Sequence, residues 1–146
     1  MGLEKITSAL SEKGLKVTHQ RIVVYQALLF TKKHPTAEQV YESIKEPYPT
    51  ISLATVYKTL ETLAENKLIN KVSTPQGTMR YDARIDNHNH IYIANTHEIL
   101  DYDDEELKEI LLQYLKKKNF NNLNITDFKL QIKGEKINPK KGISIT

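Results

Sequence analysis

The order of helix and turn signals in the first 82 residues constrains the fold of this chain most strongly. Three residues that can cap a helix, Thr18, Thr36 and Ser52, follow one another at intervals that suit short helices. The segment 36–39, Thr-Ala-Glu-Gln, is a complete capping box. A Pro/Gly turn at residues 74–77 then separates two short segments of strand-like composition, which predicts a hairpin. Helices followed by a hairpin are the order of a winged helix-turn-helix domain.

The predicted helix 52–66 is the candidate for the DNA-reading helix, because the second helix of a helix-turn-helix pair enters the major groove. Its expected inner face is apolar and consists of Leu53, Val56, Leu60 and Leu63. The opposite face contains Thr55, Lys58 and Thr62, with Ser52 and Thr59 beside it. This face lacks acids and could meet a phosphate-lined groove, although an ordinary solvated face can have the same composition.

Residues 83–146 predict a small mixed domain. Short strands are expected at 91–93 and 98–100, followed by a helix with acids at its start and lysines at its end. Strict alternation over 126–133 predicts a half-buried strand. A sheet with one helix in about 60 residues has a thin core, so we expect burial against a second copy.

The fold class predicted from these patterns is α+β. Residues 1–82 form an N-terminal winged helix-turn-helix domain, and residues 83–146 form a small C-terminal α/β dimerisation domain with a basic tail. The first domain contains 11 Lys and Arg against 8 Asp and Glu, whereas the second contains 10 of each. This modest excess fits a nucleic-acid partner but is weak evidence by itself.

Composition narrows the classes of protein further. The chain is 39% hydrophobic and 27% charged, which is a soluble globular balance rather than a disordered one. No apolar run approaches the ~20 residues of a membrane span, and the N-terminus lacks the apolar core of a secretory signal. There is no cysteine, which excludes disulfides and thiolate metal sites. We therefore expect a cytoplasmic protein with no membrane partner.

One histidine pair suggests a metal site. His88 and His90 lie two apart in a polar segment, and residues two apart in an extended chain point to the same side. Asp82 and Asp101 lie nearby in sequence, and imidazole and carboxylate donors without thiolate suit iron(II), manganese(II) or zinc(II). Spacing alone neither brings these groups together in space nor adds the distant His34, and two histidines in a polar loop often bind nothing.

Several longer strings of the chain resemble those of one known family. They are residues 14–21 (GLKVTHQR), 34–41 (HPTAEQVY), 52–60 (SLATVYKTL), 80–82 (RYD) and 88–90 (HNH) leading to Asp101. In order and spacing, these strings are similar to the ferric uptake regulator family over roughly residues 4–103. The resemblance implies a metal-dependent transcriptional repressor that binds pseudo-palindromic, double-stranded operator DNA as a homodimer.

The resemblance also implies the residues of a regulatory metal site. In the family the corresponding positions are a histidine before the Pro-Thr-Ala string, an acid closing the wing, the two histidines of the His-x-His segment and a final acid. Here they are His34, Asp82, His88, His90 and Asp101. Iron-uptake regulators usually have Glu at the two acidic positions, whereas peroxide-sensing regulators (PerR) have Asp, as this chain does. Fe(II) or Mn(II) is then the expected ion, with Zn(II) also possible, and peroxide is expected to oxidise His34 or His88.

For DNA binding, the resemblance singles out Tyr57 and Lys16. Tyr57 matches the family's tyrosine that packs against thymine methyls, and Lys16 matches a lysine that reaches the minor groove. Arg21 and Lys58 are expected phosphate contacts, and Ser52 and Thr55 belong to the same reading surface. The alternative for Tyr57 is a half-buried position at the edge of the apolar stripe, which needs no DNA.

Two positions depart from the family pattern. The family commonly has two Cys-x-x-Cys pairs that hold a structural zinc, but Ile93 and Thr96 occupy the first pair and the tail has no cysteine. We therefore expect no structural zinc held by four cysteines, with apolar packing holding the second domain instead. His97 lies where the family often has glycine, and an exposed loop histidine is favoured there over an extra metal ligand.

The sequence thus predicts a peroxide-responsive, metal-dependent repressor that is not an enzyme and takes no small organic substrate. One alternative is an iron, manganese or zinc uptake regulator without peroxide sensing. A mononuclear iron oxygenase or hydrolase is a second alternative, but it would not need the DNA-facing module, and no separate general base stands out. A third is a winged-helix adaptor without metal, whose binding would ignore chelators.

Overall fold

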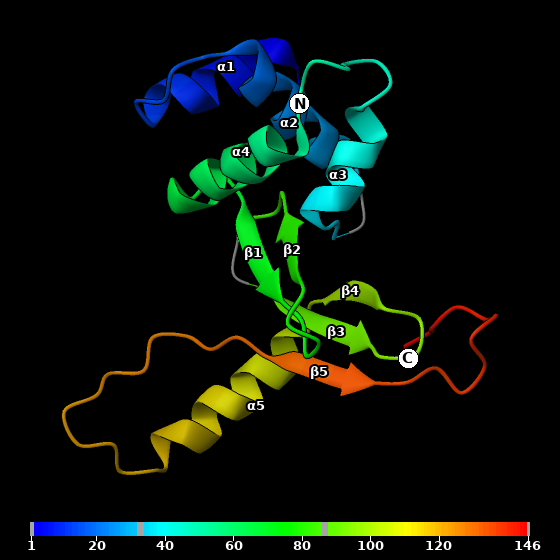
Figure 1. Cartoon of the computed structure of the whole chain (residues 1–146). Coiled ribbons are helices and arrows are strands. Elements are labelled where there is room, and N and C mark those ends of the chain that lie inside the picture. The colour runs from blue at the N-terminus through cyan, green and yellow to red at the C-terminus, as the bar shows by residue number, and fades with distance from the viewer. Residues whose placement is uncertain (1, 32–33, 86–87, 146) are drawn as a thin grey trace. The chain divides into compact units, whose positions relative to one another are not determined.

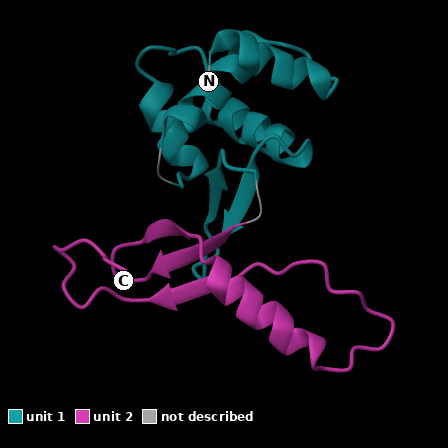
Figure 2. Cartoon of the chain, turned by 180° about the vertical axis from the view of Figure 1, so that it is seen from behind, with its two compact units in different colours: residues 1–86 teal, residues 87–146 magenta. Residues whose placement is uncertain are grey.

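The computed structural model describes residues 2–31, 34–85 and 88–145. The chain divides into two compact units, unit 1 with residues 1–86 and unit 2 with residues 87–146 (Figure 2). The functional division at residues 82–83 stays a prediction. No helix within the described residues is long and apolar enough to cross a membrane.

The described residues of unit 1 form four helices followed by a two-stranded hairpin (Figure 1). The helices are α1 (Leu3–Glu12), α2 (His19–Phe30), α3 (Ala37–Ile44) and α4 (Leu53–Glu65), and the strands are β1 (Asn70–Ser73) and β2 (Met79–Asp82). This is the order that the helix and turn signals predict. With the small sheet of unit 2, it confirms the α+β fold class.

The helices of unit 1 begin and end where local chemistry allows. Thr18, Thr36 and Ser52 each accept a hydrogen bond from the backbone N–H three residues later. The Gln39 side chain accepts in return from the Thr36 N–H, which completes the capping box. Helix α1 ends before Gly14, whose φ of 71° is the left-handed conformation that favours glycine after a helix.

Helix α4 contributes one full stripe to the core of unit 1. Val56, Leu60 and Leu63 are fully buried, as expected, whereas Leu53 is half-buried. The placement of Thr59 beside the solvent face was wrong, because its side chain is 6% exposed and packs inward. Residues 56, 59, 60 and 63 follow the i, i+3, i+4, i+7 spacing of a buried helical stripe, so the threonine shares the apolar face.

Unit 2 is built on a three-stranded sheet with the strand order β4–β3–β5. Its elements are β3 (Asn89–Ile93), β4 (Glu98–Tyr102), helix α5 (Glu105–Lys116) and β5 (Gln131–Gly134). Strands β3 and β4 are antiparallel neighbours, and their register places His90 directly opposite Asp101. Strand β5 runs parallel to β3 on its other side.

Strand β5 is shorter than the alternation over residues 126–133 predicted. Regular pairing begins only at Gln131, opposite His90, and ends at Gly134, opposite Ile93. Since β3 itself has only five residues, residues 126–130 have almost no strand beside them to pair with. The expected half-buried strand was therefore wrong for those residues, and all four residues of β5 are exposed.

Two asparagines fix the ends of β5. At its start, the Asn89 Oδ1 accepts from the Leu130 N–H at 2.9 Å. Beyond its end, the Asn95 amide exchanges two hydrogen bonds of 3.0 Å with the backbone of Lys136. The Lys136 ammonium also donates to Glu98 at 2.8 Å. Apolar packing alone was expected to hold this domain. At this edge of the sheet, polar contacts act in addition to the packing of the buried Ile93.

Helix α5 begins where its acids predict, with Asp104 accepting from the Leu107 N–H at 3.0 Å. None of its residues is buried, although its apolar stripe is complete. Ile110 is 57% exposed and Tyr114 is 53% exposed. Such a stripe on a folded chain is the surface that a partner would cover.

Candidate functional site

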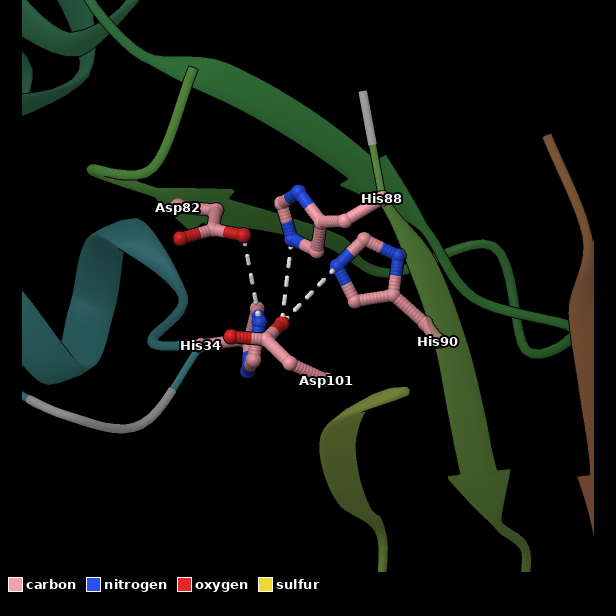
Figure 3. A group of neighbouring side chains, drawn as sticks. All are labelled: His34, Asp82, His88, His90 and Asp101. Carbon is pink, nitrogen blue, oxygen red and sulfur yellow. Dashed lines mark ion pairs between the residues drawn. The ribbon is translucent and has the colours of Figure 1, made fainter. Parts of the chain in front are cut away.

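The structure places a histidine and an aspartate of unit 1 in contact. His34 Nε2 lies 3.2 Å from Asp82 Oδ2, and both residues are buried (Figure 3). The second carboxylate oxygen, Oδ1, accepts from the Arg84 N–H at 2.9 Å. The Asp82 carboxylate is thus oriented by its own turn, with one oxygen directed at the imidazole.

Backbone contacts bring these two residues together although they lie far apart in sequence. The Tyr81 N–H donates to the Pro35 carbonyl at 2.9 Å, so the end of β2 lies against the segment that leads into α3. The Arg80 guanidinium donates to the His34 carbonyl at 3.2 Å. His34 precedes Pro35 and Asp82 follows Tyr81, so these bonds fix the separation of the pair.

Unit 2 gathers two histidines around one aspartate. His88 Nε2 lies 3.0 Å and His90 Nε2 3.3 Å from the same Asp101 oxygen, Oδ1 (Figure 3). The two imidazole rings are 4.5 Å apart between centroids and tilted by 60°. Both histidines are buried, whereas the Asp101 side chain is 37% exposed. The three candidate ligand atoms lie within 4.8 Å of one another.

The sheet of unit 2 explains this convergence. His90 and Asp101 are cross-strand partners, so their side chains emerge on the same face. His88 lies two residues before His90 in extended chain and therefore points to that face as well. Buried imidazole nitrogens that face a carboxylate are stable when a proton or a cation lies between them. Nitrogen and oxygen donors without thiolate suit a divalent transition ion.

Four of the residues expected to contact DNA lie on α4 and its N-cap. Ser52, Tyr57 and Lys58 are exposed, and Thr55 is half-buried beneath the Ser52 hydroxyl, which it contacts at 3.0 Å. Tyr57 is 40% exposed and its hydroxyl donates to the Glu38 carboxylate on α3. This hydrogen bond raises the pKa of Tyr57 and lowers the pKa of Glu38.

Lys16 and Arg21 lie close together before and within the first turn of α2. Lys16 is exposed, and the Arg21 guanidinium donates to the Lys16 carbonyl at 2.7 Å. This contact leaves the Lys16 ammonium on the surface. The assignment of both residues to DNA contacts stays a prediction.

His97 lies in the tight turn between β3 and β4 with a φ of 59°. Few residues other than glycine adopt this conformation without strain. The side chain is exposed and its Nδ1 lies 3.3 Å from the Tyr92 hydroxyl. It does not belong to the group of candidate metal ligands among the described residues.

Glu61 connects helix α4 to the hairpin of unit 1, a contact that the sequence analysis did not predict. Glu61 on α4 accepts from the Tyr81 hydroxyl through Oε1 and from the Lys71 ammonium through Oε2, both at 2.8 Å. Lys71 and Tyr81 are cross-strand partners in the hairpin. The observed register of the hairpin explains the contact, because cross-strand partners share a face and reach the same neighbour.

Comparison with known proteins gives a consistent result. The model of the Ferric uptake regulator family matches residues 12–132. The peroxide-responsive repressor PerR of Staphylococcus aureus (strain Mu50) is 29% identical over 108 residues, which are 74% of this chain and 73% of that protein.

Two solved structures share the fold. The ferric uptake regulator Fur of Helicobacter pylori, described as having three functional metal binding sites, aligns with a TM-score of 0.79 at 22% identity. That alignment covers 97% of this chain and 93% of that one. The peroxide stress regulator of Campylobacter jejuni aligns with a TM-score of 0.61 at 26% identity, covering 95% and 99% of the two chains.

Proposed function

The chain belongs to the Ferric uptake regulator family, whose members are transcription regulators and not enzymes, and we propose that it is a metal-dependent, peroxide-responsive repressor. In this proposal it binds pseudo-palindromic operator DNA as a homodimer and releases it when peroxide oxidises the metal site. The observation that carries the proposal is the gathering of buried histidines around aspartates in both units.

In the proposed active form, His34 and Asp82 of unit 1 and His88, His90 and Asp101 of unit 2 hold one divalent ion. The donors fit such an ion, because three imidazole nitrogens and two carboxylates provide the ligands that iron(II) and manganese(II) prefer, and zinc(II) accepts. Ligands from both units mean that metal binding fixes the DNA-binding unit relative to unit 2. The difference in metal affinity between the fixed and free forms then sets how strongly the ion favours DNA binding.

Peroxide sensing is supported by the aspartates at positions 82 and 101 and by the similarity to a peroxide-responsive repressor. Iron(II), when bound, would promote cleavage of the O–O bond of hydrogen peroxide, and the imidazole ring would supply the net two electrons of the reaction. His34 or His88 then gains one oxygen atom at a ring carbon, the displaced hydrogen moves to a ring nitrogen, and the other peroxide oxygen leaves as water. The oxidised ring is a poorer ligand, so the ion is lost and DNA is released.

DNA reading is assigned to α4, with Tyr57 contacting bases and Lys58 contacting phosphate. Lys16 and Arg21 extend the cationic surface, and Ser52 and Thr55 lie at the N-terminus of α4, where backbone N–H groups favour phosphate. The exposure of Tyr57 supports this role, because a tyrosine that belonged to the core would have its ring covered.

The homodimer is supported by the surface of unit 2. Helix α5 buries none of its own residues, and the apolar side chains of Ile110, Tyr114 and Ile132 are exposed in a single chain. A second copy that covers these side chains would supply the core that unit 2 lacks. Sedimentation of the metal-free chain at micromolar concentration should give a dimer, and a stable monomer would contradict this part of the proposal.

The test of the function uses DNA selected from a random library by the Mn(II)-loaded protein. Both the Mn(II) and the Fe(II) forms, prepared without oxygen, should bind this DNA. Mild hydrogen peroxide should release only the Fe(II) form, and mass spectrometry should find one added oxygen on His34 or His88. The variant Asp101→Glu should still bind DNA with metal but oxidise more slowly, because a longer carboxylate crowds the position that peroxide needs.

The outcomes separate the candidate functions. Fe(II)-loaded protein that keeps its DNA and its unmodified histidines would indicate a metal-uptake regulator without peroxide sensing. DNA binding that ignores chelators would indicate an adaptor without a regulatory metal.

A further inference from the structure

Tyr81 connects the His34–Asp82 pair to helix α4, and we infer that it is a positioning residue that transmits part of the effect of metal binding to DNA affinity. The inference rests on the proposed function and adds to it a route within unit 1. The route runs from the metal ligands through the Tyr81 backbone and its side chain to Glu61 on α4.

The backbone of Tyr81 holds the metal-ligand side of this route. Its N–H donates to the Pro35 carbonyl at 2.9 Å, and the two bonded residues are the direct chain neighbours of Asp82 and His34. An ion that draws the two ligands together therefore acts on the residue pair joined by this hydrogen bond. Any resulting shift of β2 moves the Cα atom of Tyr81, because that atom lies one residue from Asp82.

The side chain of Tyr81 holds the α4 side. The residue is 1% exposed, so its ring is confined by the core of unit 1, and its hydroxyl donates to Glu61 Oε1 at 2.8 Å. A packed core transmits displacement rather than absorbing it. Glu61 lies one helical turn after Tyr57 and Lys58, the residues assigned to DNA, so a movement at Glu61 tilts the reading end of the same rigid helix.

The hydroxyl group separates this role from packing. A phenylalanine ring would fill the same part of the core, whereas the tyrosine adds a directed bond between the ligand-bearing strand and the helix. Lys71 on β1 also donates to Glu61, at 2.8 Å, but β1 contains no candidate metal ligand. The Lys71 hydrogen bond therefore reaches the same Glu61 carboxylate but does not connect it to the metal ligands. Removing this bond provides a matched control.

The experiment measures the ratio of DNA affinity with Mn(II) to affinity without it. Coupling between two ligands is typically ~5–150-fold in such ratios, and Tyr81→Phe should reduce the wild-type ratio by at least about threefold. The Mn(II) affinity of the DNA-free protein should stay within about twofold of wild type, because no ligand is altered. Lys71→Met and Tyr25→Phe, which removes a hydroxyl from another buried tyrosine of the same core, should keep the wild-type ratio.

Two further measurements make the result specific. If Tyr81 acts through Glu61, then Glu61→Met, which removes the acceptor for the Tyr81 hydroxyl, and the double variant should have the same reduced ratio as Tyr81→Phe, which is a non-additive cycle. Without DNA, Mn(II) should change the hydrogen-exchange protection of α4 amides in the wild type and much less in Tyr81→Phe. Thermal unfolding of the metal-free variants checks that all of them are folded.

The outcomes distinguish failure of the inference from failure of the function. A wild type that responds to Mn(II) beside a Tyr81→Phe variant that responds equally would overturn the inference and leave the function intact. A wild type whose DNA affinity and α4 protection both ignore Mn(II) would overturn both.

Discussion

Replacing Asn95 by alanine should lower the free energy of unfolding by about 1–2 kcal/mol, because it removes two hydrogen bonds at the edge of the unit 2 sheet. The Asn95 amide donates to the Lys136 carbonyl and accepts from the Lys136 N–H, each at 3.0 Å. A net hydrogen bond contributes about 0.5–1.5 kcal/mol, and both of these are exposed to competing water, which places the pair in the lower half of its possible range. Asn95→Asp keeps the acceptor but loses the donor, so its loss should be smaller than that of alanine.

The assay is guanidinium unfolding at one fixed protein concentration, because a dimer would make stability depend on concentration. Asn121→Ala is the matched control, since Asn121 is exposed in the same unit, and its effect should stay within about 0.5 kcal/mol. The loss of unfolding free energy caused by Asn95→Ala should be the same with and without a chelator, because this edge of the sheet has no cysteines that could hold a zinc ion. If Asn95→Ala matches the control, then the edge of the sheet is held by other contacts and the reasoning is refuted.

Two other predictions concern unit 1. Tyr57→Ala should weaken binding to selected DNA by ~1–3 kcal/mol and reduce the preference for its sequence, whereas Lys58→Ala should weaken binding to all sequences alike and flatten its salt dependence. Filter binding across a salt series measures both effects. Normal binding by both variants would mean that α4 does not read the DNA. The Lys71 ammonium and the Tyr81 hydroxyl lower the pKa of Glu61 below its ordinary 4.5, so the stability that this carboxylate contributes is present above pH 4.5 and is lost as the pH falls through its lower folded value. Unfolding of wild type and Glu61→Gln across this pH range should therefore show a gap at neutral pH that closes in acid, and a gap independent of pH would contradict the assignment.

Local signals in the sequence were sufficient for the helices of unit 1. The side chains that cap α2, α3 and α4 act only on backbone groups within three residues, so their positions are legible without knowledge of the tertiary fold. The register of β3 and β4 likewise depends on neighbouring segments joined by a short turn. Convergence of His88 and His90 on Asp101 follows from that register and the two-residue repeat of a strand.

The alternation of polar and apolar residues was not sufficient to predict a strand where no neighbouring strand is available for pairing. Residues 126–133 alternate in sequence, yet the regular strand begins only at Gln131. The neighbouring β3 begins at Asn89, and its hydrogen bonds to this segment start at Leu130. Thr59 illustrates a different error, in which a residue at the boundary between two helix faces was assigned to the wrong face. Its place in the helical stripe puts it among Val56, Leu60 and Leu63.

The meeting of His34 with Asp82 lies beyond local reasoning, because no repeat or turn relates residues so far apart. What brings them together is a single strand end laid against the segment before α3, and the bond between the Tyr81 N–H and the Pro35 carbonyl records that placement. This hydrogen bond cannot be recognised in the sequence, because any residue except proline offers a backbone N–H and every residue offers a backbone carbonyl. The pair therefore depends on the packing of the hairpin under α4, to which Tyr81 contributes a fully buried ring. Unit 2 needs no such packing to place its aspartate opposite a histidine, because strand register alone does so.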